Sequence, residues 1–300
     1  MKKIIILGGP TASGKSKLAL NIAKELDGEI INGDSMQVYK YFPILTCQPK
    51  YDDLKLVPHH LYGFVNTIKN YNAVKWLKDA NKKINEVLIK DKVPIIVGGS
   101  GLYLEFMTRG ISSTPKISDN IKEKANLFLL NTSKSKLLNF IMEIDKEYAL
   151  KINIADKFRV LKLLEVYFET NKNISYFHNK RKKNNNFGFF KVLIKPSKDE
   201  VKKNIRRRVI EMLKEGLVQE IIDNRDKVKN CNIEKAIGFR EIKSYLEQKL
   251  LFEEAIDLTI KNTKSFAKRQ YTWFENRFEE NLIISNTKTS LVVETFLKII

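Results

Sequence analysis

Residues Gly9-Pro-Thr-Ala-Ser-Gly-Lys-Ser16 decide the fold of this 300-residue chain. They follow an apolar run, Ile4–Leu7, and precede a helical pattern over Ser16–Leu26. This is the phosphate-binding pattern G-x-x-x-x-G-K-[ST] in the strand-to-helix setting that it requires. The backbone N–H groups of such a loop and the first turn of its helix bind an anion together. The pattern predicts a bound di- or triphosphate and leaves open what is done to it.

Each residue of this loop is expected to contribute to phosphate binding. Lys15 places a positive charge beside the terminal phosphate, and the hydroxyl of Ser16 is a candidate ligand for Mg²⁺. The expected diphosphate-binding residues are Gly9, Pro10, Thr11, Ala12, Ser13, Gly14, Lys15 and Ser16.

The strands and helices around the loop predict an α/β fold. Apolar, β-branched runs at Ile4–Leu7, Glu29–Ile31 and Val93–Val97 alternate with helical patterns at Ser16–Leu26 and Ala73–Leu88. This alternation is typical of a parallel sheet with helices packed on it. A later apolar run, Phe189–Ile194, is expected to return to the same sheet.

Between residues 112 and 187 the pattern changes to helix-spaced apolar residues with many lysines, most clearly at 119–130, 134–146 and 156–170. The polar stretch 181–186 is predicted to be a loop or hinge. We therefore expect a P-loop parallel-sheet core flanked by helices (1–111 and 188–300), a helical insertion domain (112–187) and a helical C-terminal region from Lys198.

The overall composition favours a polyanionic partner. Lys and Arg number 54 against 35 Asp and Glu, which gives a net charge of +19. Such a surplus favours nucleic acid, although a genome biased toward Lys and Asn would produce it too. No signal peptide and no membrane-spanning apolar run is evident, so we expect a cytoplasmic protein. Two cysteines, Cys47 and Cys231, and three histidines exclude a disulfide framework or a zinc finger.

Asp34 is the candidate general base. It follows the second predicted strand, and residues at the carboxyl ends of parallel strands face the ligand. A carboxylate there can take a proton from a nucleophile or hold Mg²⁺ through water, whereas a turn or helix N-cap is the structural alternative. The run Val93–Val97 ends without an acidic residue, which argues against a plain ATPase.

Other candidates are ambiguous when taken one at a time. The Gly98–Gly101 segment, with Ser100, either approaches a ligand or merely ends a strand. Of the three arginines Arg206–Arg208, one can reach a phosphate bidentately while the others face solvent. Ser265–Arg277 interleaves basic and aromatic residues as RNA-binding surfaces do, but its aromatic residues also suit a core. His59-His60 is expected to be a turn with one hydrogen-bonded histidine, and no metal site.

In combination, these segments resemble the tRNA dimethylallyltransferase family over nearly the whole chain. A kinase with the same loop would share only the first of them. The matching segments are Gly9–Ser16, Asp34-Ser-Met-Gln-Val-Tyr39, Pro58-His-His-Leu61, Val97-Gly-Gly-Ser-Gly-Leu-Tyr103, Met212–Leu217, Ile237-Gly-Phe-Arg-Glu241, Asn262-Thr263 and Ala267-Lys-Arg-Gln-Tyr-Thr-Trp-Phe274.

The resemblance implies transfer of a dimethylallyl group from dimethylallyl diphosphate to the exocyclic amine of the adenine 3′ of the tRNA anticodon. The loop would then bind a leaving diphosphate, with Lys15, Mg²⁺ at Ser16 and Arg208 stabilising its charge. Asp34 would take the proton of the amine. Ser100 stands where the family commonly has Thr and keeps a hydroxyl near the reacting groups. The family acts mostly as a monomer, and no protein partner is implied.

The resemblance also implies an RNA-binding surface, with the insertion clamping the anticodon stem-loop. Two departures from the family pattern affect it. Within Ile44–Pro49, Leu45 stands where the family has a glycine and Gln48 where it has a lysine, which Lys50 is placed to replace. Lys162 stands where an arginine is usual. The implied tRNA-binding residues are Asp34, Ser35, Met36, Gln37, Ser100, Asp156, Phe158, Arg159, Arg240, Lys268, Arg269, Gln270 and Trp273.

Three alternatives remain open at this point. An isopentenyltransferase acting on free adenine nucleotides needs the same chemistry and no RNA clamp. A small-molecule kinase would bind ATP in the loop and use Asp34 on a hydroxyl, which leaves the basic C-terminal helix unexplained. A non-catalytic RNA-binding protein is disfavoured by the intact Lys15, Ser16 and Asp34.

Overall fold

The computed structural model describes residues 2–67, 71–112, 114–180, 187–228, 231–285 and 288–299. It divides into a core unit, formed by Met1–Thr108 and Asn185–Ile300, and an insertion unit, Arg109–Asn184. Each edge of the insertion unit lies three residues before the predicted one. The hinge expected at 181–186 lies outside the described residues.

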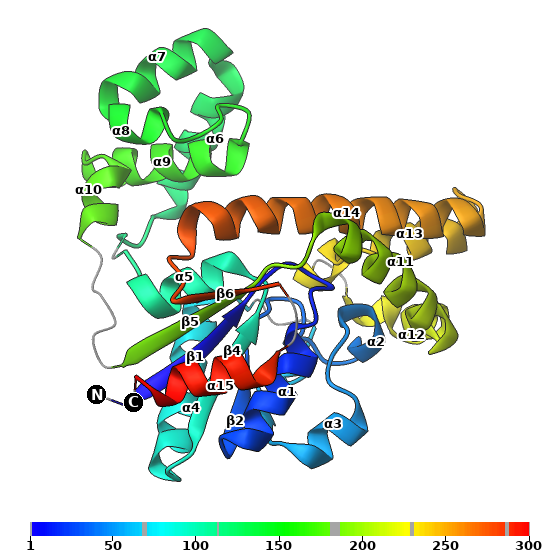
Figure 1. Ribbon diagram of the computed structural model, residues 1–300. Helices are drawn as coiled ribbons and strands as arrows, with labels where there is room; N and C mark the ends of the chain where they lie inside the picture. The colour runs from blue at the N-terminus through cyan, green and yellow to red at the C-terminus, as the bar shows by residue number, and fades with distance from the viewer. Residues whose placement is uncertain are drawn as a thin grey trace. The chain divides into compact units, whose positions relative to one another are not determined.

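The core unit contains a parallel six-stranded sheet in the order β3-β2-β4-β1-β5-β6 (Figure 1). All four predicted strands are present, each longer by one or two residues. Two short strands were not expected: His59-His60 pairs with β2 where a turn was predicted, and β6 interrupts the mostly helical C-terminal region. The strands are β1 (Lys3–Gly8), β2 (Gly28–Asn32), β3 (His59–His60), β4 (Val93–Gly98), β5 (Gly188–Ile194) and β6 (Leu282–Ile284).

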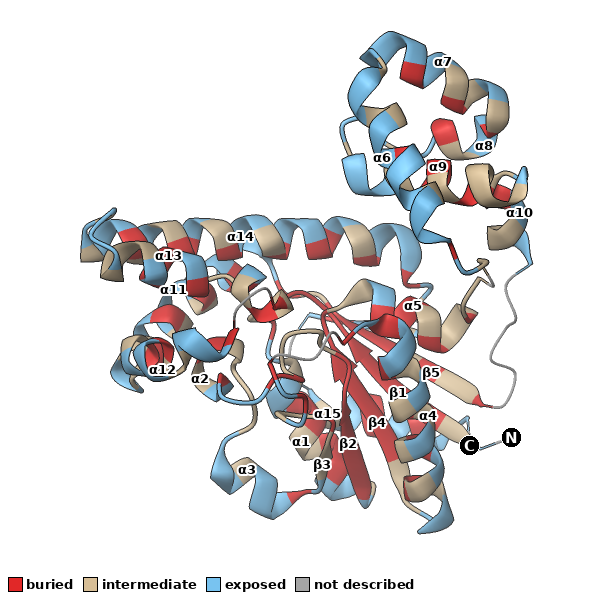
Figure 2. Ribbon diagram, turned by 180° about the vertical axis from the view of Figure 1, so that it is seen from behind, coloured by how far each residue is buried: buried red, intermediate tan, exposed pale blue. Residues whose placement is uncertain are grey.

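Helices cover both faces of this sheet, because alternate strand residues point to opposite sides. Ile5 and Leu7 pack in one apolar cluster with helices α1 and α15, whereas Ile4 and Ile6 pack in another with α4 and α5. Figure 2 shows the resulting buried strands beneath half-exposed helices. The core-unit helices are α1 (Lys15–Glu25), α2 (Pro43–Thr46), α3 (Tyr51–Leu56), α4 (Ala73–Ile89), α5 (Gly101–Arg109), α11 (Lys198–Lys214), α12 (Leu217–Asn224), α13 (Phe239–Leu246), α14 (Phe252–Arg277) and α15 (Thr289–Leu297).

The insertion unit is helical and has its own apolar core. Its cluster includes Ala125, Ile141 and Leu163, each fully buried. The buried carboxylate of Asp145 accepts hydrogen bonds from both the backbone N–H and the hydroxyl of Ser175, which ties two helices together. The helices are α6 (Asp119–Asn131), α7 (Lys134–Ile144), α8 (Lys146–Ala149), α9 (Lys157–Thr170) and α10 (Ile174–Asn179).

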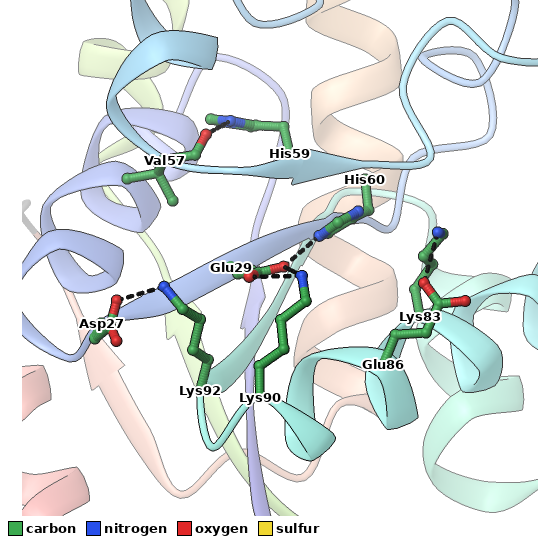
Figure 3. A network of polar contacts seen from close by, with 9 residues as sticks. All are labelled: Asp27, Glu29, Val57, His59, His60, Lys83, Glu86, Lys90 and Lys92. Atoms are coloured by element: carbon green, nitrogen blue, oxygen red, sulfur yellow. Dashed lines mark hydrogen bonds and ion pairs between the residues drawn. The ribbon is translucent and has the colours of Figure 1, made fainter.

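A buried carboxylate joins β2 to its neighbours in the core unit (Figure 3). The side chain of Glu29 is 2% exposed and lies 2.7 Å from Nε2 of His60 on β3. Lys90, at the end of α4, donates to the same carboxylate at 3.1 Å. Burial raises the pKa of Glu29, but the hydrogen bonds from His60 and Lys90 outweigh burial and leave that pKa below its ordinary value.

We expect Glu29→Gln to lower the free energy of unfolding by about 1–3 kcal/mol near neutral pH, because hydrogen bonds to a buried charge are lost. A carboxyl whose pKa is lower in the folded state stabilises the protein above its unfolded pKa, and this stabilisation disappears as pH falls through the folded pKa. The difference from wild type should therefore shrink in acid. Urea unfolding at several pH values measures this difference in the free energy of unfolding.

Glu86→Gln, which removes a surface ion pair with Lys83, is the control and should change the free energy of unfolding little. A Glu29→Gln protein as stable as wild type near neutral pH would contradict this role.

Candidate active site

The phosphate loop connects β1 to α1 and wraps around the side chain of Lys15. Gly14 precedes the helix with a φ of 89°, a left-handed conformation that favours glycine. The ammonium of Lys15 donates to the carbonyls of Gly9 at 2.8 Å and Pro10 at 2.5 Å. These contacts hold the lysine at the loop.

The surroundings of Lys15 disfavour its positive charge. Its pKa is lowered from 10.5 to about 7: burial has the largest effect, the nearby carboxylate of Asp34 opposes it, and the positive charge of Arg208 adds to it. An anion in the loop would add negative charge beside this partly buried ammonium. The loop is therefore suited to bind an anion together with a proton.

The Asp34 segment lies at the end of β2 and is held by hydrogen bonds at several points. Oδ1 of Asp34 accepts from the backbone N–H of Met36 at 2.9 Å. The Ser100 hydroxyl accepts from the N–H of Ser35 at 2.9 Å and donates to the Ser35 hydroxyl at 3.1 Å. Ser100 thus connects the residue next to Asp34 to the end of β4, and both strand ends lie at the same edge of the sheet.

Arg208 reaches the loop from helix α11. Its Nη2 donates to the hydroxyl of Thr11 at 2.7 Å. Its Nε is buried and has no hydrogen-bond partner among the described residues. One turn earlier, Asn204 donates to the carbonyl of Ala12 at 3.2 Å. An unpaired buried donor is costly, so this guanidinium has bonding capacity left for an anionic ligand. Arg206 and Arg207 are exposed.

Helix α14 contributes a glutamine side chain that joins the phosphate loop to the end of β4. Gln270 is 5% exposed, and its Oε1 accepts from the N–H of Thr11 at 2.7 Å while its Nε2 donates to the carbonyl of Gly99 at 2.9 Å. The amide therefore joins the phosphate loop to the end of β4. Trp273 packs so closely on Gly101 that an added Cβ there would lie 2.3 Å from its ring. The contact of Gln270 and Trp273 with tRNA stays a prediction, but both have a packing role inside the protein.

Lys15, Asp34, Asn204, Arg208 and Gln270 line one cavity of about 590 Å³, whereas Ser100 and Trp273 are not part of its lining. Cations outnumber the two carboxylates, Asp34 and Glu211, so the cavity suits an anion. The lining cations are Lys15, Lys17, Arg207, Arg208, Lys235 and Arg269. The same cavity includes the loop residues Thr11–Ser16 and the segment Asp34–Gln37. A second cavity, of about 640 Å³, shares part of this lining: Ser16, Cys47, Val97, Arg208, Glu211 and Met212.

The remaining predicted site residues lie elsewhere. Gly9 and Pro10 form the base of the loop, and Lys268 is exposed on α14. Arg240 is exposed on α13, where its Nε donates to the carbonyl of Glu234 at 3.1 Å. In the insertion unit, Asp156 caps α9 by accepting from the N–H of Arg159 at 3.2 Å, and the side chain of Arg159 lies 3.4 Å from the same carboxylate. Phe158 is 80% exposed.

The residues that depart from the family pattern have partners inside the protein. Nε2 of Gln48 donates to the carbonyl of Tyr39 at 2.9 Å. Lys50 forms an exposed ion pair with Glu215 at 2.6 Å, and Lys162 lies 3.4 Å from Glu165. Lys50 lines the second cavity and not the first.

Sequence reasoning missed several residues of the cavity wall. Asn204 lies four residues before Arg208 on one helix, and this spacing could have identified it. Cys47 and Met212 meet across the wall, with their sulfur atoms 3.8 Å apart; no sequence pattern indicates this contact. Burial raises the pKa of the Cys47 thiol, which keeps it protonated. No group of three or more His, Cys, Asp or Glu residues suited to a metal occurs in the described ranges.

Fold and site together define a P-loop α/β protein in which loop residues Thr11–Ser16 and the carboxylate of Asp34 line the same cavity. The chain belongs to the IPP transferase family, whose model matches residues 37–277. It is 37% identical to the tRNA dimethylallyltransferase of Rickettsia bellii, over 100% of this chain and 96% of that protein. The solved tRNA isopentenylpyrophosphate transferase of Bacillus halodurans is 27% identical with a TM-score of 0.73, covering 100% and 96% of the two chains. A eukaryotic dimethylallyltransferase acting on tRNA is 26% identical with a TM-score of 0.81, covering 99% and 78%.

Within the part of the chain that the structure describes, helices are too short or too polar to span a membrane.

Proposed function

We propose that this chain transfers a dimethylallyl group from dimethylallyl diphosphate to the exocyclic amine of the adenine 3′ of the tRNA anticodon. The observation that carries the proposal is that Asp34, Lys15 and Arg208 line one cavity in a chain of the IPP transferase family. The relatives named above act on tRNA, which supports tRNA as the acceptor.

In the proposed reaction the bond between C1 of the dimethylallyl group and the diphosphate oxygen breaks, and a bond from C1 to the amine nitrogen forms. The diphosphate leaves with its electron pair. Loop N–H groups, Lys15 and Arg208 stabilise the charge that develops on it. The adenine amine is a poor nucleophile, because its lone pair is delocalised into the ring. Asp34 accepts the proton that this nitrogen loses.

The residues at the loop fit a magnesium ion bound with the diphosphate. Mg²⁺ commonly takes one or two protein oxygens and completes its shell with phosphate oxygens and water. Ser16 offers its hydroxyl, and the Asp34 carboxylate lines the same cavity. A bound Mg²⁺ would supply further charge stabilisation to the leaving group.

The RNA-binding role is proposed for two surfaces, one in each unit. On α14, Lys268 and Arg269 are exposed, and Arg269 also lines the cavity. In the insertion unit, Arg159 and the exposed ring of Phe158 suit a phosphate and an unstacked base. The insertion would clamp the anticodon stem-loop, and the cost of extruding the adenine, a few kcal/mol, would be offset by these contacts.

If Arg269 and Arg159 neutralise phosphates, replacing each with Ala should weaken tRNA binding. The slope of log K against log salt concentration should become shallower by about one unit for each variant. Binding titrations at several salt concentrations measure this. Lys24→Ala, at the opposite end of α1 from the phosphate loop, is the matched charge control and should leave the slope unchanged. Wild-type slopes in both arginine variants would rule out these two phosphate contacts.

Diphosphate binding should be accompanied by proton uptake, because Lys15 has a pKa of about 7 without ligand. An anion in the loop raises that pKa, so at pH 8 binding should take up close to one proton. Calorimetric titration with inorganic diphosphate in buffers of different ionisation enthalpy gives this number. In Lys15→Arg the guanidinium stays protonated, and the uptake should disappear. Binding at pH 8 without proton uptake by the wild type would contradict this account of Lys15.

The two enzymatic alternatives make different predictions about the acceptor. The family match begins at residue 37 and so does not depend on the phosphate loop, which disfavours a generic kinase. Labelled dimethylallyl diphosphate should be offered with an anticodon stem-loop RNA or with AMP, ADP or ATP. Labelling of the RNA alone supports the proposal. Labelling of a free nucleotide would support the isopentenyltransferase acting on free adenine nucleotides instead.

A further inference from the structure

The residue that leads into the Asp34 loop is a buried asparagine whose side-chain amide is fully used. Asn32 ends β2 and is 0% exposed. Its Oδ1 accepts from the backbone N–H of Asp34 at 2.8 Å, and its Nδ2 donates to the carbonyls of Asp34 and Leu61, each at 3.0 Å. A single amide therefore holds both backbone polar groups of Asp34.

This restraint extends to the carboxylate of Asp34. Oδ1 of Asn32 accepts a hydrogen bond from the N–H of Asp34, two residues ahead, and Oδ1 of Asp34 accepts one from the N–H of Met36, again two residues ahead. Both are the side-chain-to-backbone turns that Asn and Asp favour. The side chain of Asn32 thus restrains the backbone of Asp34, and the Met36 N–H restrains its Oδ1, whereas no described residue donates to its Oδ2.

Asn32 is itself held rigidly. The indole Nε1 of Trp76, a fully buried side chain on α4, donates to the Asn32 carbonyl at 2.7 Å. Trp76 stacks on Tyr103, with ring centroids 4.7 Å apart. The next residue, Gly33, donates its N–H to the carbonyl of Val97 on β4 at 2.7 Å. The aromatic core and two strands thus fix the asparagine that holds Asp34.

We propose that Asn32 is a positioning residue, which orients the carboxylate of Asp34 toward the reacting amine. The inference rests on the proposed function, since it needs Asp34 to act as the base. Of the three hydrogen bonds of the Asn32 side chain, only one, from Nδ2, goes to the Leu61 carbonyl. The other two go to the backbone of Asp34. We therefore assign Asn32 the role of holding Asp34 in place.

The test is a double-mutant cycle on kcat and KM with tRNA and dimethylallyl diphosphate, using Asn32→Ala, Asp34→Ala and the double variant. Asn32→Ala should lower kcat by roughly 10- to 100-fold, because a small misplacement of a base costs that much, with little change in KM for the diphosphate. In the Asp34→Ala background the same change should cost almost nothing further. Asn32→Ser keeps a hydroxyl acceptor for the Asp34 N–H, more weakly, and should fall between wild type and Asn32→Ala.

Thr67→Val controls for lost stability, because Thr67 is as fully buried as Asn32 and its hydroxyl donates to the Lys227 carbonyl at 2.6 Å. It should lower Tm and leave kcat unchanged. If Asn32→Ala lowers kcat by the same factor in the Asp34→Ala background as in the wild type, the inference is overturned, while the assignment of Asp34 as the base is not affected. An unchanged kcat in Asn32→Ala, or a kcat loss in Thr67→Val that matches that of Asn32→Ala, would also overturn the inference. Wild-type turnover of Asp34→Ala is a different result and would overturn the proposed base itself.

Discussion

Replacing Asp34 should lower kcat by roughly 10²–10⁴, as expected when a general base is lost, with tRNA affinity nearly unchanged. The reason is the place of Asp34 at the end of β2, where its carboxylate lines the same cavity as the phosphate loop. Asp34→Asn is the sharper variant than Asp34→Ala. Its amide keeps an oxygen that can accept from the Met36 N–H, but it has no basic carboxylate.

Single-turnover rate constants of both variants, together with tRNA binding measurements, distinguish a role of Asp34 as the base from a role in shaping the loop. If Asp34 acts as the base, Asp34→Asn and Asp34→Ala should be equally impaired. If Asp34 only shapes the loop, Asp34→Asn should retain most of the wild-type rate. Wild-type turnover in Asp34→Asn would refute the assignment of the base.

Arg208→Ala should lower kcat by roughly 10²-fold, similar to the loss of one donor that stabilises developing negative charge. The guanidinium contacts Thr11 in the loop, and its buried Nε has no partner among the described residues. Arg208→Lys keeps the charge but not the planar fork of donors, so it should recover only part of the activity.

Arg206→Ala is the matched control for this prediction. Arg206 is exposed on the same helix, two residues away, and does not line the cavity. Its replacement should leave kcat unchanged. Steady-state kinetics with varied dimethylallyl diphosphate compares the two. Equal rates for Arg208→Ala and wild type would show that Arg208 does not act on the leaving group.

The strand–loop–helix pattern predicted the sheet core well because the signals were local. Apolar runs such as Ile4–Leu7 alternate between two buried faces, and the glycines of the loop stand at fixed spacings. The strands that were missed, His59-His60 and Leu282–Ile284, have two and three residues. So short a segment carries no periodicity, and its pairing with β2 or β5 depends on tertiary contacts.

The sequence predicted only those site residues whose charge or hydroxyl group, together with their position after a strand, indicates a chemical role. Lys15, Ser16 and Asp34 could be selected from their place after strands. The bridging role of Gln270 could not, because its partners Thr11 and Gly99 are far away in sequence. Asn32 directly follows the second predicted strand, but its hydrogen bonds to Asp34 depend on the fold of the loop, and no motif indicates them.

The central claim is tested most directly by incubating the protein with dimethylallyl diphosphate, Mg²⁺ and unmodified tRNA, and then measuring the masses of the nucleosides. The account predicts that one adenosine, 3′ of the anticodon, gains a dimethylallyl group, and that Asp34→Asn forms far less of this product. A parallel reaction with ATP in place of the prenyl diphosphate should leave the tRNA unchanged. Unaltered nucleosides in the complete reaction with the wild-type protein would contradict the account.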